Sequence, residues 1–104
     1  MGDEHIEVTT DGPRTTAALH GEFDMAATFT VEPALERLVE EPGLEALTLD
    51  LSDLRFLDST GVGVLVRLAD ETRERGIELT IAPGPPEIQR VFEVSGLADV
   101  LPFG

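Results

Sequence analysis

The chain has 104 residues and a formal net charge of −14; its basic residues are all arginine, and it contains no cysteine. Such an acidic chain is repelled by nucleic-acid phosphates and anionic lipid, while the missing cysteine and lysine exclude disulfides, thiol chemistry, P-loop sites and Schiff-base catalysis. We therefore expect a single cytoplasmic domain over residues 1–104 that binds no nucleic acid or membrane directly, and whose acidity either favours a basic protein partner or only maintains solubility.

Five segments have the composition of β-strands. The first two flank the turn residues Asp11, Gly12 and Pro13, which are typical of a chain reversal. The third segment is apolar, as expected of a buried strand, and the fourth alternates apolar and polar residues. The five segments are residues 5–10, 14–23, 46–51, 77–82 and 100–103.

The first helical pattern covers about residues 31–41. Proline is tolerated in the first turn of a helix but breaks its interior, so Pro33 places the start of this helix close to residue 31. Thr30 is then the expected N-cap, and the helix is expected to end before Gly43.

Two further helical patterns cover about residues 60–75 and 85–96. In the first of these, Val64 and Leu68 lie off the main apolar stripe. They are either buried under the last helix or exposed as an apolar patch for a partner.

In chain order, these elements predict an α/β fold: a small mixed β-sheet of about five strands with about three to four helices packed on it. Strands joined through helices should be parallel, with right-handed crossovers. Functional loops in such folds follow the carboxyl ends of the parallel strands. The segment SDLRFLDST, residues 52–60, is the loop expected at that place, and it is the candidate site.

A small hydroxylated corner ends this segment. Asp58 is of a type that caps helices, and it could alternatively hydrogen-bond the Ser59 hydroxyl. Gly61 and Gly63 follow, and each costs a helix about 1 kcal/mol relative to alanine. The glycines could permit close packing of the helix on the sheet, keep Ser59 accessible, or do both.

The segment LTLDLSDLRFLDSTGVGVLVRL, residues 47–68, resembles the signature of the STAS family, the sulphate transporter and anti-sigma factor antagonist domains. LHGEFD, residues 19–24, and IQRVFEVSGLADVLPF, residues 88–103, are similar to two further segments of that family. The resemblance covers nearly the whole chain and implies a STAS-like fold. It also implies the role of an anti-sigma factor antagonist, which is not an enzyme and has no cofactor of its own.

In bacterial antagonists of this family, the serine after the aspartate of this motif is the phospho-acceptor, which by position implies Ser59. The implied partners are an anti-sigma factor with serine kinase activity and a serine phosphatase. The unmodified antagonist would bind the anti-sigma factor and release the sigma factor, and phosphorylation would end that complex. The resemblance is compatible with a monomer and with a homodimer. The expected partner-binding residues are Asp24, Asp58, Ser59, Thr60, Gly61, Val62, Gly63 and Val64.

The chain departs from the family pattern in three places. Thr60 stands where a second serine is more usual, and residues 25–33 insert polar and β-branched residues before the expected first helix. The sequence stops at Gly104, where many relatives continue into a final helix.

Three alternative functions use the same residues differently. Within the family, the chain could be a scaffold or a ligand-sensing module in a larger signalling assembly. A hydrolase would use Ser59 as its nucleophile, but His5 and His20 have no evident link to it. A receiver domain would be phosphorylated on Asp50 or Asp58 and would use a late lysine, which this sequence lacks.

Overall fold

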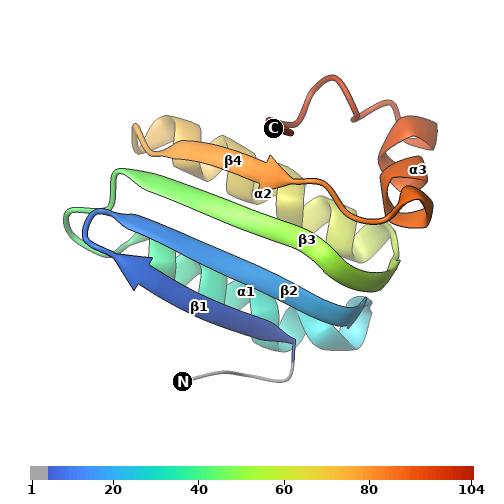
Figure 1. Ribbon diagram of the computed structural model, residues 1–104, viewed down its shortest axis with the longest axis horizontal. Helices are drawn as coiled ribbons and strands as arrows, with labels where there is room; N and C mark the ends of the chain where they lie inside the picture. Colours follow the sequence, from blue (N-terminus) through green and yellow to red (C-terminus); the bar gives the residue numbers. More distant parts are fainter. Residues whose placement is uncertain (1–4) are drawn as a thin grey trace.

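The computed structural model describes residues 5–104, in which a mixed β-sheet is combined with helices (Figure 1). In chain order the elements are β1 (Ile6–Asp11), β2 (Arg14–Phe23), α1 (Met25–Val39), β3 (Ala46–Leu57), α2 (Ser59–Glu74), β4 (Glu78–Ala82) and α3 (Pro86–Val94). The strands lie in the order β1-β2-β3-β4, with β1 antiparallel to β2 and the other pairs parallel. The expected fold class and the N-terminal hairpin are confirmed.

The expected count of about five strands is wrong for the described part of the chain, where the sheet has four. The segment 100–103 contributes a single parallel bridge, between Phe103 and Ile81. Pro102 accepts a hydrogen bond from the Ile81 N–H at 2.9 Å but has no N–H to donate, so the ladder does not extend. The Phe103 ring instead packs edge-on against Phe92 of α3, with 5.0 Å between the ring centroids.

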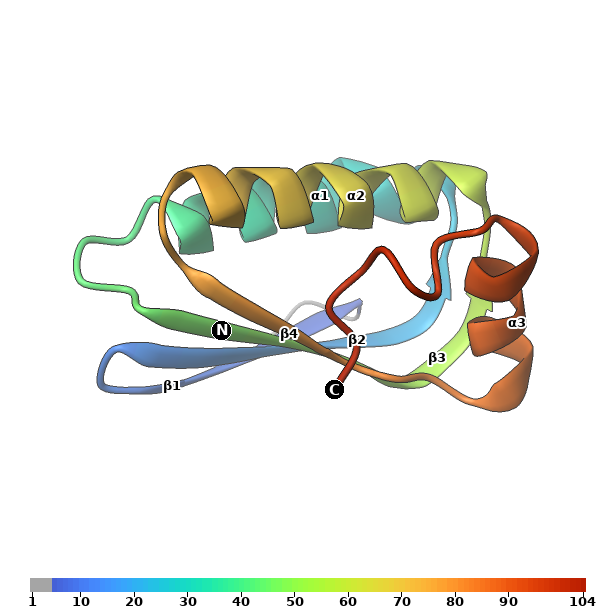
Figure 2. The same cartoon turned by 90° about the horizontal axis from the view of Figure 1, so that it is seen from above.

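The hydrophobic core lies between the sheet and the helix pair α1–α2, which run side by side over one face (Figure 2). Leu47, Leu49 and Leu51 alternate along β3 and are fully buried, and they belong to one core cluster with Leu35 of α1 and Leu65 of α2. The third helix, α3, packs against β3 near the carboxyl ends of the parallel strands (Figure 1). None of the helices in residues 5–104 is long and apolar enough to cross a membrane.

The first helix begins six residues earlier than its sequence pattern predicts. Its N-cap is Asp24, whose carboxylate accepts a hydrogen bond from the Ala27 N–H at 3.0 Å, so Thr30 as N-cap is wrong. Pro33 lies inside the helix and not in its first turn. Thr28 is buried near the start, and its hydroxyl donates to the Met25 carbonyl at 2.6 Å. The residues expected to precede the helix therefore form its first half.

Strand β3 is twice as long as the segment expected to form it, and SDLRFLDST is therefore not a loop. Its pairing with β2 continues to the last residue of both strands, with two irregularities at which β3 gains a residue over β2. These bulges keep Leu51, Leu54 and Leu57 all buried, although they are three residues apart and not two. Only Asp58 separates β3 from α2.

The second helix begins and ends within one residue of its expected limits. Val64 and Leu68 are buried, so an exposed apolar patch formed by them is wrong. The expected burial under the last helix, α3, is also wrong. Val64 and Leu68 instead face α1, and with Leu35 of that helix they line a small cavity of about 90 Å³.

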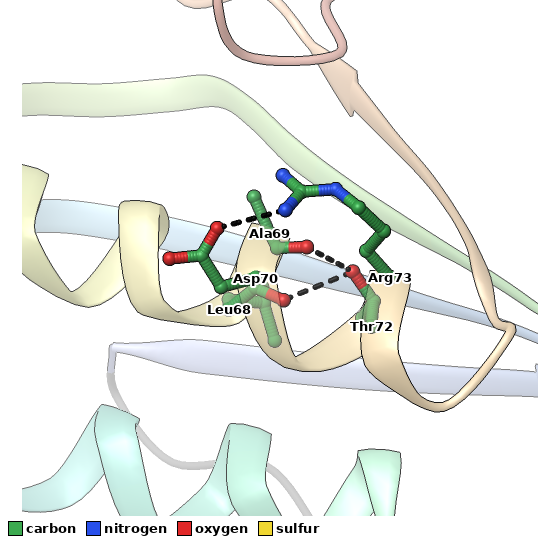
Figure 3. A network of polar contacts seen from close by, with 5 residues as sticks. All are labelled: Leu68, Ala69, Asp70, Thr72 and Arg73. Carbon is green, nitrogen blue, oxygen red and sulfur yellow. Dashed lines mark hydrogen bonds and ion pairs between the residues drawn. The ribbon is translucent and has the colours of Figure 1, made fainter.

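The buried side of α2 also contains a hydroxyl group. Thr72 donates to the carbonyl oxygens of Leu68 and Ala69 at 2.9 and 3.0 Å (Figure 3). On the exposed side of the same turn, Arg73 pairs with Asp70 at 3.1 Å. A buried hydroxyl without partners costs about 1–3 kcal/mol, and these bonds avoid that cost.

Replacing Pro33 with alanine is expected to raise the free energy of unfolding by about 1–3 kcal/mol. A proline inside a helix removes one backbone hydrogen bond and crowds the preceding turn, whereas its stiffening of the unfolded chain is worth only about 0.4–1 kcal/mol. Urea unfolding of Pro33→Ala and of the exposed-site control Glu36→Ala measures the difference. A Pro33→Ala chain less stable than wild type would contradict this account of α1.

Candidate functional site

Strands β2 and β3 end side by side, and each passes directly into a helix through an aspartate. Phe23, the last residue of β2, pairs with the last residue of β3. Asp24 accepts a hydrogen bond from the Ala27 N–H, and Asp58 accepts one from the Gly61 N–H, both at 3.0 Å. Both aspartates are therefore N-caps, and α1 and α2 start at the same edge of the sheet (Figure 2).

This arrangement brings the N-terminal ends of two helices to one surface. Each end carries a partial positive charge from the helix dipole, which the capping carboxylates complement. The backbone N–H of Asp58 also points at the Phe23 carbonyl oxygen, 3.4 Å away, and so links the start of α2 to the end of β2. Of the two roles considered for the Asp58 side chain, the structure shows capping.

Ser59 is the first residue of α2, and its side chain is exposed to solvent. The long loop expected around it is reduced to Asp58, because β3 continues to Leu57. Ser59 is therefore presented by a direct strand-to-helix junction. Thr60, the second hydroxyl, is half-buried.

The two glycines of the motif have different surroundings. A Cβ atom at Gly61 would lie 2.7 Å from the Phe23 carbonyl oxygen and 2.8 Å from a Leu57 methyl group, so only glycine fits there. A Cβ atom at Gly63 would meet nothing closer than the Arg67 guanidinium, at 3.5 Å, which is ordinary contact. Close helix-to-sheet packing thus explains Gly61 but leaves Gly63 without a reason inside the chain.

The structure divides the eight expected partner-binding residues by their exposure. Gly61, Val62 and Val64 are buried, so any contribution of theirs to binding acts through the packing of α2. The other five reach the surface around the start of α2, and they are Asp24, Asp58, Ser59, Thr60 and Gly63.

Two exposed apolar side chains lie in the first turns of α1, next to the surface that these five residues form. Met25 is 60% exposed and Phe29 is 77% exposed. Sequence patterns miss them if α1 is taken to begin near residue 31. The available signal is Asp24, a good N-cap type, followed by two large apolar residues four positions apart.

His20 lies on β2 between two carboxylates. Its Nε2 atom is 3.7 Å from a Glu7 oxygen, and its Nδ1 atom is 3.5 Å from an Asp53 oxygen. These contacts join β1, β2 and β3, whereas Ser59 lies at the start of α2. Among residues 5–104, no group of three or more His, Asp or Glu side chains could hold a metal ion.

The chain is similar to known proteins over most of its length. The sequence model of the STAS domain matches residues 5–104. The chain is 35% identical over 81 residues to the anti-sigma-B factor antagonist of Listeria monocytogenes, covering 78% of this chain and 70% of that protein.

Solved structures have the same fold. The anti-sigma factor antagonist SpoIIAA in its unphosphorylated form gives a TM-score of 0.80 at 19% identity, covering 95% of this chain and 87% of that one. The Bacillus protein SpoIIAA in its phosphorylated form gives 0.73 at 19% identity, covering 95% and 90%. An anti-sigma factor antagonist from Mycobacterium paratuberculosis gives 0.79 at 25% identity, covering 94% and 82%.

Alanine at the two glycines should change stability in opposite directions. Gly61→Ala is expected to lower the free energy of unfolding by about 1–3 kcal/mol, because the new methyl group overlaps the Phe23 carbonyl oxygen. Gly63→Ala is expected to raise it by about 0.5–1 kcal/mol, because alanine restricts the unfolded chain and fits the helix. Denaturant titration of both variants tests this, and equal effects would refute the distinction.

Proposed function

Because the chain belongs to the STAS domain family, we propose that it is an anti-sigma factor antagonist whose binding to an anti-sigma factor is ended by phosphorylation of Ser59. The observation that carries this proposal is the exposed Ser59 side chain at the first position of α2, directly after the capping Asp58. A relative is named an anti-sigma-B factor antagonist, and SpoIIAA, which has the same fold, has been solved in a phosphorylated form.

The site tolerates a phosphate without loss of the fold. A phosphate on Ser59 would sit at a helix N-terminus, where free N–H groups and the helix dipole stabilise an anion by about 0.3–2 kcal/mol. The Ser59 side chain is exposed, so the added group need not displace the core. Modification should therefore act on the interface with a partner.

An interface around Ser59 is strongly sensitive to such a group. The phosphate adds about −1.5 to −2 charge beside the carboxylates of Asp58 and Asp24, which cap the two helices. Burying it without a cationic partner costs several kcal/mol, and about 2.8 kcal/mol already weakens an affinity a hundredfold.

In the proposed cycle, the unmodified chain binds an anti-sigma factor that is also a serine kinase, and the sigma factor is released. The kinase transfers phosphate from ATP to Ser59 and ends the complex, and a serine phosphatase resets it. ATP belongs to the kinase, so this chain needs no cofactor or catalytic residue. We place this cycle in the cytoplasm. The net charge of the chain, −14, favours a basic partner surface over nucleic acid or anionic lipid.

Phosphotransfer and binding measurements test the site. Serine-kinase anti-sigma factors from the same genome are purified singly and incubated with labelled ATP and wild-type, Ser59→Ala, Ser59→Asp or Thr60→Ala chains. We expect one kinase to label wild type and Thr60→Ala but not Ser59→Ala. Binding to the same kinase is then measured with ADP in place of ATP, so that no phosphate is transferred. The Kd of Ser59→Ala should lie within about threefold of wild type, and that of Ser59→Asp should be at least about tenfold weaker.

Label that persists in Ser59→Ala would show that the acceptor residue is wrong. If no anti-sigma factor binds the wild-type chain, and it instead enters a large signalling assembly, the scaffold function replaces the one proposed here.

The phosphorylated chain should keep its fold. Far-UV circular dichroism and the denaturation midpoint are expected to stay close to those of the unmodified chain, with a change of less than about 2 kcal/mol in the free energy of unfolding. Wholesale unfolding on phosphorylation would contradict a switch that acts at the interface.

A further inference from the structure

Phe29 on α1 has the most exposed aromatic side chain among residues 5–104. Phe29 is 77% exposed and follows Met25 by one helical turn, so both side chains lie on one face of α1. Exposed apolar side chains that share one face can form a contact site, whereas single exposed apolar residues are ordinary.

An ion pair fixes which way this face points. Glu32 lies three residues after Phe29, and its carboxylate accepts a hydrogen bond from Arg67 Nε of α2 at 2.9 Å. Residues three, four and seven apart share one face of a helix, so Met25 and Phe29 lie on the face of α1 that Glu32 turns toward α2.

The matching face of α2 contains the switch region. Thr60 and Gly63 lie seven and four residues before Arg67, on the face of α2 that Arg67 turns toward α1. The Arg67 guanidinium lies over Gly63, 3.5 Å from the position of a Cβ atom there. The helices α1 and α2 run side by side from the same edge of the sheet (Figure 2). The Glu32–Arg67 contact therefore places the turn of α1 that holds Phe29 beside the first turns of α2, which hold Thr60 and Gly63.

We propose that Met25 and Phe29 are the apolar anchor by which this chain binds its anti-sigma factor, with Phe29 inserted into an apolar pocket of that protein. This rests on the function proposed above. It adds two residues on α1 to a surface otherwise built from the start of α2. Because Gly63 has no side chain of its own, only the exposed Arg67 guanidinium, which can move, covers the backbone there.

Charge selects the kind of partner. On the α1–α2 face that holds the anchor, Arg67 is paired with Glu32, which leaves the capping carboxylates of Asp24 and Asp58 as the charges at the helix starts. The complementary pocket is therefore apolar at its centre, and its rim carries only the arginine or lysine side chains that pair with Asp24 and Asp58, so that a phosphate on Ser59 would find no free cation there. A second copy of this chain is disfavoured by its own charge of −14, as is an anionic bilayer.

The anchor also accounts for how one phosphate can end the complex. An aromatic side chain at the centre of an interface carries much of the binding energy only while water is excluded around it. A phosphate on Ser59, at the rim of the same contact, would bring its hydration shell into that region.

Truncating the anchor tests the proposal on the full chain. The probe is the anti-sigma factor that binds wild type in the experiment above, titrated with ADP present. Phe29→Ala is expected to weaken Kd by about 10- to 100-fold, and Met25→Ala by about three- to tenfold. Val94→Ala, at an 81% exposed apolar residue on α3, is the matched control and should change Kd by less than about twofold. Because these side chains are exposed, all three variants should keep the wild-type denaturation midpoint.

Photo-crosslinking adds a readout of position. p-Benzoylphenylalanine at position 29 should crosslink to the anti-sigma factor, and crosslinking should be lost when Ser59→Asp is added; the same group at position 94 should not crosslink. If wild type binds and Ser59→Asp weakens binding while Phe29→Ala does not, the anchor is refuted and the proposed function stands. If Phe29→Ala instead abolishes self-association in sedimentation, the occupant is a second copy and the proposal is overturned. If wild type binds no anti-sigma factor, the proposed function fails and the anchor with it.

Discussion

The contact between Gly61 and the end of β2 sets the geometry of the site. Here α2 comes so close to the sheet that a Cβ atom would lie 2.7 Å from the Phe23 carbonyl oxygen. The same oxygen lies 3.4 Å from the backbone nitrogen of Asp58, and the next residue, Asp24, caps α1. Because one strand end positions the starts of both helices, the backbone presents Ser59 at a fixed place, whatever its own side chain contacts.

Packing inside the chain explains one of the two glycines of the motif but not the other. Both cost a helix about 1 kcal/mol, but at Gly61 tight packing offsets that cost, whereas at Gly63 no contact inside the chain does. A residue that breaks a local rule without a gain in packing is expected at functional surfaces. Gly63 lies in the second turn of α2, beside the exposed start of the helix, where a partner's approach would supply the missing reason.

The junction between β3 and α2 can be predicted from the sequence more accurately than the bounds of α1 and β3. Capping is a local property of residue types, so the roles of Asp58 and the start of α2 can be predicted from DSTGVG alone. For the start of α1 the N-cap type of Asp24 competes with Pro33, which is the usual sign of a first turn and here lies in a helix interior that tertiary packing maintains. The length of β3 is hidden by two bulges, which change its apolar spacing from two to three residues. Burial of Val64 depends on α1 packing beside α2, a tertiary contact with Leu35 that no local pattern gives.

Position, and not total charge, has to carry the proposed switch. A phosphate adds about −1.5 to −2 to a chain that already has −14, so the long-range attraction of a basic partner hardly changes. Inside an interface the same group dominates, because an anion without a cationic partner keeps its water. Surface charge then governs the rate of encounter, since steering acts mainly on association. In the proposed complex, the apolar contact of Phe29 governs how long the complex lasts, and the state of the Ser59 hydroxyl decides whether that contact forms.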